Sequence, residues 1–190
     1  MIYQAVKLLA QQLNNNLKIE AGDDSIPDDF VQLRNVAHLT ADEISRLNNV
    51  LITLVIASED IPVKHFPDNT RNIGRGASRY LSLYVLISSC VYHSYDQSLL
   101  NLSHIINFFD NNGTFTWPVK PGTETVTGGF RLTVENYSPS FEETSNLWTT
   151  MGGRQFPHMV YRVRMAELPK QNPVERRGII KQFEARERVS

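Results

Sequence analysis

Residues 146–165, NLWTTMGGRQFPHMVYRVRM, contain three elements in a row that decide the organisation of the chain. The pattern predicts a helix end that includes Trp148, a turn at Gly152 and Gly153, and a strand that starts at Pro157. Glycine readily adopts the positive φ that ends many helices. Alternation along the strand predicts one core-facing set, Met159, Tyr161, Val163 and Met165. The opposite face carries Arg162 and Arg164, which are either simply solvated or available to a partner.

Composition limits the class of protein. With 190 residues, 41% of them hydrophobic and 21% charged, the chain fits one globular domain with or without tails. The net charge of -1 opposes electrostatic binding to nucleic acid, so no nucleic-acid partner is expected. One cysteine excludes an intrachain disulfide and a thiolate zinc site. The start of the sequence lacks a signal-peptide pattern, and the apolar runs are too short to span a bilayer. We therefore expect cytoplasmic assembly and no direct membrane insertion.

The N-terminal third predicts helices and one central strand. Apolar residues recur every three or four positions over residues 2–17, which predicts an amphipathic helix that packs on its own domain or on a neighbouring subunit. A short strand falls within residues 28–39. Thr40 and Glu43 have capping-box spacing and predict one helical turn. Residues 49–57, NVLITLVIA, are apolar on both faces and predict a central strand.

The middle third predicts a second central strand and a helix. Residues 58–79 form a long polar connection, and residues 80–92 alternate as a strand. Asp96 is expected to cap a helix that runs to about Asp110 and ends at residues 111–113. Its predicted apolar side consists of Leu99, Leu102, Ile106 and Phe109, with Ile105 and Phe108 beside them.

The last third completes an α+β domain. Residues 115–118 predict an edge strand, residues 120–129 a second connection, and residues 130–135 a half-buried strand. Ser140 and Glu143 form a second capping box before the helix that carries Trp148. We expect residues 1–168 to form one domain, in which a mixed, mainly antiparallel β-sheet is packed by about three helices.

Residues 169–190 form a C-terminal extension with a different character. Two prolines bracket a linker at residues 169–173, and the segment that follows is highly charged with few large apolar residues. Such a segment either stays disordered or docks on a partner as a helix or as an added strand. These readings stay open at the level of sequence.

No part of the sequence predicts catalysis, a metal site or a cofactor site. Cys90, His93 and Asp96 are close in sequence, but residues three apart on a strand face opposite ways. The glycines at 74 and 76 lead into a strand, whereas a phosphate loop leads into a helix. The histidines lack the spacing of a metal-binding helix: His38, His65, His93, His104 and His158. We therefore predict a non-enzyme.

Four stretches in order resemble the cap, or tail tube-terminator, family of phage-tail-like contractile injection systems. They are the N-terminal helix, VLITLVIASED at 50–60, YLSLYVLISSCVYHSYDQSLLNLSHIINFF at 80–109, and FEETSNLWTTMGGRQFPHMVYRVRM at 141–165. The resemblance covers residues 1–168. It implies a tail-terminator-like fold and a homo-oligomer, a hexameric ring that ends the inner tube and the sheath far from the baseplate. The particle would be released from the cell or associated with a membrane. An adaptor that links such a ring to another component or to an envelope is the alternative.

A ring subunit needs surfaces for its neighbours, for the tube and for the sheath. The resemblance implies sheaths held together by exchanged strands, and we expect residues from 174 onward to join or cap that exchange by strand addition. The candidate interface residues are Arg71, Arg75, Arg79, Arg162, Arg164, Arg176, Arg177, Ile179, Ile180 and Phe183. The arginines would face acidic surfaces of the tube or the sheath, and solvation is the alternative for each. The residues expected to hold the motif together are Trp148, Gly152, Gly153, Pro157 and Tyr161.

Overall fold

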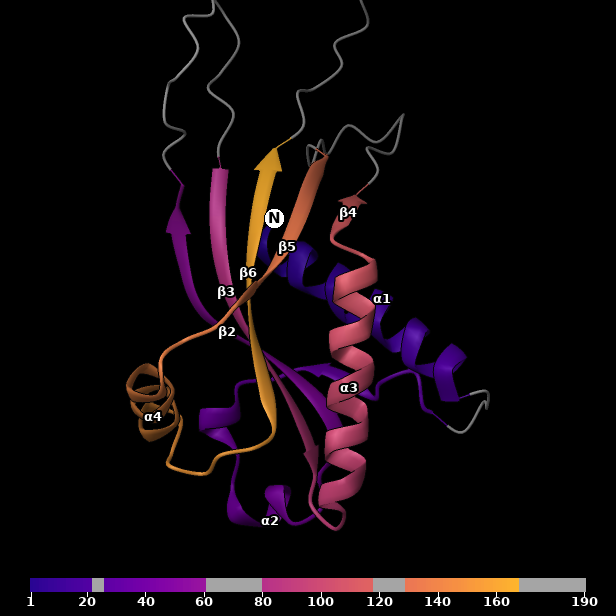
Figure 1. Ribbon diagram of the computed structural model, residues 1–190, viewed down its shortest axis with the longest axis vertical. Coiled ribbons are helices and arrows are strands. Elements are labelled where there is room, and N and C mark those ends of the chain that lie inside the picture. Colours follow the sequence, from indigo (N-terminus) through magenta and orange to yellow (C-terminus); the bar gives the residue numbers. More distant parts are fainter. Residues whose placement is uncertain (22–25, 61–79, 118–128, 168–190) are drawn as a thin grey trace, which may run out of the picture.

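A computed structural model describes residues 1–21, 26–60, 80–117 and 129–167 (Figure 1). The predicted connections at 58–79 and 120–129 lie largely outside these residues, and the C-terminal extension lies wholly outside them. The elements are α1 (Ile2–Ala21), β1 (Val31–Leu33), the 3-10 helix η1 (Val36–His38), α2 (Ala41–Ile44), β2 (Asn48–Glu59), β3 (Tyr80–Val91), α3 (Tyr95–Asn111), β4 (Thr114–Trp117), β5 (Phe130–Tyr137), α4 (Phe141–Thr150) and β6 (His158–Glu167). The predicted α+β class is confirmed.

The strands of the described residues form one six-stranded sheet, in the order β1-β2-β3-β6-β5-β4. Only β1 and β2 are parallel, and the other neighbours are antiparallel. The mixed, mainly antiparallel sheet is therefore confirmed. β2 and β3 are the longest of these strands. β3 has a neighbour on both sides over most of its length, whereas β2 has one on both sides only at Val50, Leu51 and Ile52. The register between them shifts once, between Leu54 and Ile56.

The sheet is covered on both faces, which explains its apolar strands. Leu83, Val85 and Ile87 of β3 pack on one face against α1 and α3. Leu86 and Cys90 point to the other face, where they meet a smaller cluster that includes Trp148. Figure 1 shows α1 crossing beside α3, with α2 and α4 lying apart from them. Alternate residues of a strand face opposite sides, so β3 supplies both cores at once.

The start of α3 differs from the prediction. Ser94, not Asp96, is the N-cap, and its hydroxyl accepts a hydrogen bond from the backbone N–H of Gln97 at 3.2 Å. Asp96 instead lies in the first turn, where the positive end of the helix dipole stabilises its carboxylate. Serine and aspartate both cap helices, and the two stand two residues apart, so the sequence alone does not separate them.

The buried face of α3 also differs from the prediction. Leu99 is 41% exposed, whereas Ser98 and Asn101 are buried with Ile105, Phe108 and Phe109. The Ser98 hydroxyl accepts a hydrogen bond from the backbone N–H of Val91 at 3.2 Å. A small polar residue is needed there because the helix begins directly against the end of β3. Because the buried side of α3 includes polar residues, a hydrophobicity pattern does not identify it fully.

Both predicted capping boxes are present, one at the start of α2 and one at the start of α4. Thr40 pairs with Glu43 at α2, and Ser140 pairs with Glu143 at α4. The hydrogen bonds from Thr40 and Ser140 lower the pKa of Glu43 and Glu143 respectively. In each case the ionised glutamate closes the box, so α2 and α4 start at defined residues beside the smaller core.

Candidate assembly surfaces

Trp148 is the centre of the smaller core. Its indole N–H donates a hydrogen bond to Nε2 of His158 at 3.3 Å. The other ring nitrogen of His158, Nδ1, lies 2.8 Å from the carbonyl oxygen of Phe156 and donates to it. These two contacts assign the neutral tautomer with the proton on Nδ1. The hydrogen-bonded chain therefore ties α4 to the first residue of β6.

The double glycine makes the sharp turn that this connection requires. Gly152 and Gly153 have φ of 97° and 76°, where residues with a Cβ are strained. The Gly153 N–H donates to the Trp148 carbonyl at 2.7 Å. The helix thus ends at the predicted glycines, and the chain reverses to start β6 after Pro157. Tyr161, three residues after His158, lies on the opposite face of β6 and belongs to the larger core.

Tyr161 anchors β6 against α3. Its ring lies 4.6 Å, centre to centre, from the ring of Phe109. Burial, with a further contribution from the charge of Asp110, raises the pKa of Tyr161 well above its usual range. The hydroxyl is therefore neutral, and the residue acts as a packing element.

Arg162 belongs to a network of three side chains on neighbouring strands. Its guanidinium contacts the Asp60 carboxylate at 3.2 Å and 3.3 Å and donates from Nε to the Ser82 hydroxyl at 3.1 Å. Ser82 in turn donates to Asp60 at 2.9 Å. The network crosses the end of β2, β3 and β6. Its charge is balanced within the subunit, and 28% of the Arg162 side chain is exposed.

Arg164 is the more accessible of the two predicted arginines. It pairs with Glu135 of β5 at 3.0 Å, and 49% of its side chain is exposed. Both arginines thus lie on the predicted face of β6, and each has an acidic partner from its own chain. Asp60, Ser82 and Glu135 were not named from the sequence. Their roles depend on the strand order, which no local pattern encodes.

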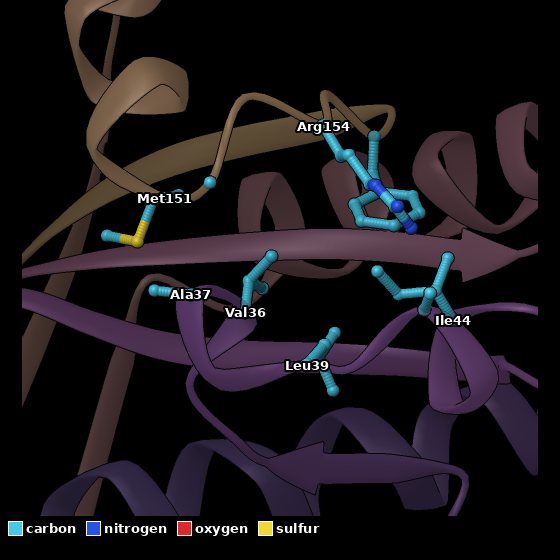
Figure 2. Close-up of a pocket in the computed structure, with 9 residues that line it drawn as sticks. Val36, Ala37, Leu39, Ile44, Met151 and Arg154 are labelled. Carbon is cyan, nitrogen blue, oxygen red and sulfur yellow. The ribbon is translucent and has the colours of Figure 1, made fainter.

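A cavity of about 190 Å³ lies beside the glycine turn. Figure 2 shows Met151 and Arg154 on one side and Val36, Ala37, Leu39 and Ile44 facing them. Most of the residues that line it have apolar side chains, and Arg154 adds one guanidinium. It contains no nucleophile, acid or base in an arrangement that supports catalysis.

Among the exposed large apolar side chains, two groups lie close together in the sequence. At the start of α3 they are Tyr92, Tyr95, Leu99 and Leu100. On β2 they are Leu54 and Ile56, which are 38% and 56% exposed. Exposed groups of this kind often mark contacts between proteins. The sequence pattern had placed Leu99 in the core and residues 49–57 in a strand buried on both faces, so neither surface was anticipated.

The single cysteine of the chain, Cys90, is buried in the smaller core. Burial raises the pKa of the Cys90 thiol to about 12, which removes the thiolate needed for nucleophilic attack. No group of three or more metal-binding side chains occurs within residues 1–21, 26–60, 80–117 and 129–167. Among the helices of these same ranges, none combines the length and hydrophobicity needed to cross a bilayer.

The remaining interface candidates lie outside the described residues. They are Arg71, Arg75 and Arg79 in the connection between β2 and β3, and Arg176, Arg177, Ile179, Ile180 and Phe183 in the C-terminal extension. Their roles stay predictions.

Comparisons with known proteins place the chain in a family. Two solved structures resemble it: the sheath/tube terminator of the PVC extracellular contractile injection system in its extended state, and the tube-terminating cap of the anti-feeding prophage. The first has 16% identity and a TM-score of 0.48, and the match covers 94% of this chain and 64% of that chain. The second has 17% identity and a TM-score of 0.44, with 83% and 55% covered.

This chain therefore spans less than two thirds of either solved chain. No curated protein matches it. Residues 5–182 match the family model described as the Pvc16 N-terminal domain. Because that match covers most of the sequence, the chain belongs to the Pvc16 N-terminal domain family, and the resemblance seen in the sequence is confirmed.

Proposed function

We propose that this protein is a structural cap subunit of a contractile injection system. The family match over residues 5–182 carries the proposal. The subunit assembles in the cytoplasm into a hexameric ring at the end of the particle distal to the baseplate. There it ends the inner tube and the sheath, without catalysing a reaction. The particle is then released or associates with a membrane.

The surfaces of the fold support this role. Subunits of a ring make heterologous contacts, in which two different patches meet and rotation closes the circle. The start of α3 and the outer part of β2 are two separate apolar patches on one subunit. The patch at the start of α3 offers a neighbouring subunit an apolar contact of the kind that a ring requires.

Native mass tests the proposal directly. We expect the purified protein to form a hexamer, either alone or when it is mixed with tube or sheath protein. The measurement is light scattering coupled to size exclusion, followed by electron microscopy of the mixed sample for rings at filament ends. A protein that remains monomeric and joins neither polymer contradicts the cap role and favours the adaptor.

Arg164 is proposed to contact an acidic surface of the tube or the sheath. Arg164→Ala should weaken binding to the filament about tenfold, or about 1.4 kcal/mol, because the contact loses its charge. It should change the free energy of unfolding by less than about 1 kcal/mol, because the pair with Glu135 is exposed. Binding is measured by co-sedimentation and stability by urea unfolding.

A matched control is Arg46→Ala, which removes an exposed arginine that follows α2, away from β6. This variant should bind like the wild-type protein. An equal loss of filament binding for both variants would show a general effect of charge. Unchanged binding of Arg164→Ala would contradict the proposed contact of this arginine with the filament. Deletion of residues 174–190 tests the extension separately: attachment that persists unchanged would contradict a part in the strand exchange of the sheath.

A further inference from the structure

The outer part of β2 has a backbone edge without a described neighbour. β1 pairs only with Val50, Leu51 and Ile52 of this strand. On its other side β2 continues to pair with β3 as far as Glu59. Among residues 1–21, 26–60, 80–117 and 129–167, no strand pairs with the outer edge of β2 between residues 54 and 59.

This edge has the properties of a strand acceptor. An unpaired edge presents backbone N–H and C=O groups that can bind another extended segment. Natural edge strands are commonly short or charged, but this one is six residues long and carries the exposed apolar side chains of Leu54 and Ile56. Its only charged residue is Glu59 at the end of the strand. The chemistry fits an extended peptide with apolar residues followed or preceded by a basic one.

The C-terminal extension leaves the sheet close to this edge. Glu59 is opposite Leu81 on β3, and Leu81 is opposite Met165 on β6. The three residues lie in one row across three strands, so Glu59 and Met165 are about 10 Å apart at the usual strand spacing. Both β2 and β6 are antiparallel to β3, and Figure 1 shows their arrowheads at the same end of the sheet. The extension therefore starts two strands away from the free edge.

We propose that residues 177–183 of the extension, RGIIKQF, add to the outer edge of β2 in the same subunit as an antiparallel strand. Nine residues, 168–176, connect Glu167 to this segment and can span up to about 30 Å, more than the crossing needs. An antiparallel strand that enters at the Glu59 end brings Arg177 beside Glu59. It then brings Ile180 beside Ile56, since each pair lies three residues further along both strands. In this one register, opposite charges pair at the first position and apolar side chains pair at the second.

Residues 61–79 also begin at this end of the sheet, but their sequence suits an added strand less well. They contain Pro62 and Pro67 near the start and Gly74 and Gly76 near the end. Proline removes a backbone donor and glycine weakens a strand. Residues 177–183 contain no proline and one glycine, Gly178, near the start of the segment.

Hydrogen exchange followed by mass spectrometry tests the pairing in the free full-length protein. Amides of residues 54–59 that face the outer edge should exchange at least about tenfold faster in Ile180→Pro than in the wild-type protein, because proline cannot donate in the ladder. The control Val189→Pro places the same change in the extension beyond the pairing segment and should leave exchange unchanged. Equal exchange in the wild-type protein and Ile180→Pro overturns the proposal.

Crosslinking identifies which subunit supplies the strand. In a Cys90→Ala background, Ile56→Cys and Ile180→Cys should form a disulfide with the mass of one chain. A disulfide found only between two chains would assign the strand to a neighbouring subunit and overturn the pairing within one subunit. Both experiments use the free protein, so their failure leaves the cap role untouched, and failure of ring formation leaves this pairing untouched.

Discussion

Trp148→Ala is expected to lower the free energy of unfolding by about 3–5 kcal/mol, the usual cost of removing a large buried aromatic side chain. The indole is 3% exposed and packs against the rings of Phe156 and His158 at 6.0 Å and 5.0 Å between centres. The smaller core also contains Leu47, Leu51 and Leu86, and the substitution removes the largest buried side chain of this cluster. Urea unfolding followed by circular dichroism measures the change.

Two further variants separate burial from the hydrogen bond. Trp148→Phe keeps an aromatic ring but removes the N–H, which leaves Nε2 of His158 unpaired, and it should cost about 1–3 kcal/mol. Phe141→Ala removes an aromatic ring from the same helix where it is 92% exposed, and it should change stability by less than about 0.5 kcal/mol. Similar losses for Trp148→Ala and Phe141→Ala would contradict the placement of Trp148 in a core.

The alternating strands could be predicted from the sequence because their chemistry is local. In β6, Tyr161 and Val163 belong to the larger core, while Arg162 and Arg164 face away from it, as a period of two requires. The turn at Gly152 and Gly153 could also be predicted, since positive φ restricts the choice of residue. Each inference needed only neighbours within a few positions.

The partners of the arginines could not be predicted in the same way. Arg162 and Asp60 are 102 positions apart in sequence and meet only because β3 lies between β2 and β6. The free edge of β2 depends in turn on how far β1 extends, and β1 ends at Leu33 after three residues. Strand order and strand length are set by the packing of the whole sheet, which no single stretch of sequence encodes.

Phe109→Ala tests the corrected face of α3 and should cost about 3–5 kcal/mol. Phe109 is buried and touches three other aromatic rings, those of Phe108, Phe115 and Tyr161. These contacts join α3 to β4 and β6, so the substitution opens a cavity between a helix and two strands. Urea unfolding measures the loss, which should appear as a lower midpoint with an unchanged slope.

Leu99→Ala is the matched control because the hydrophobic pattern placed both residues on one apolar side, whereas the structure separates them. Leu99 is 41% exposed, so its truncation should change the stability of the free subunit by less than about 0.5 kcal/mol. Equal losses for the two variants would restore the predicted helix face and contradict the burial of Ser98 and Asn101. If Leu99 instead belongs to a contact between subunits, its substitution should lower the native mass of the assembly while the isolated subunit keeps its stability, since the leucine would then be buried only in the ring.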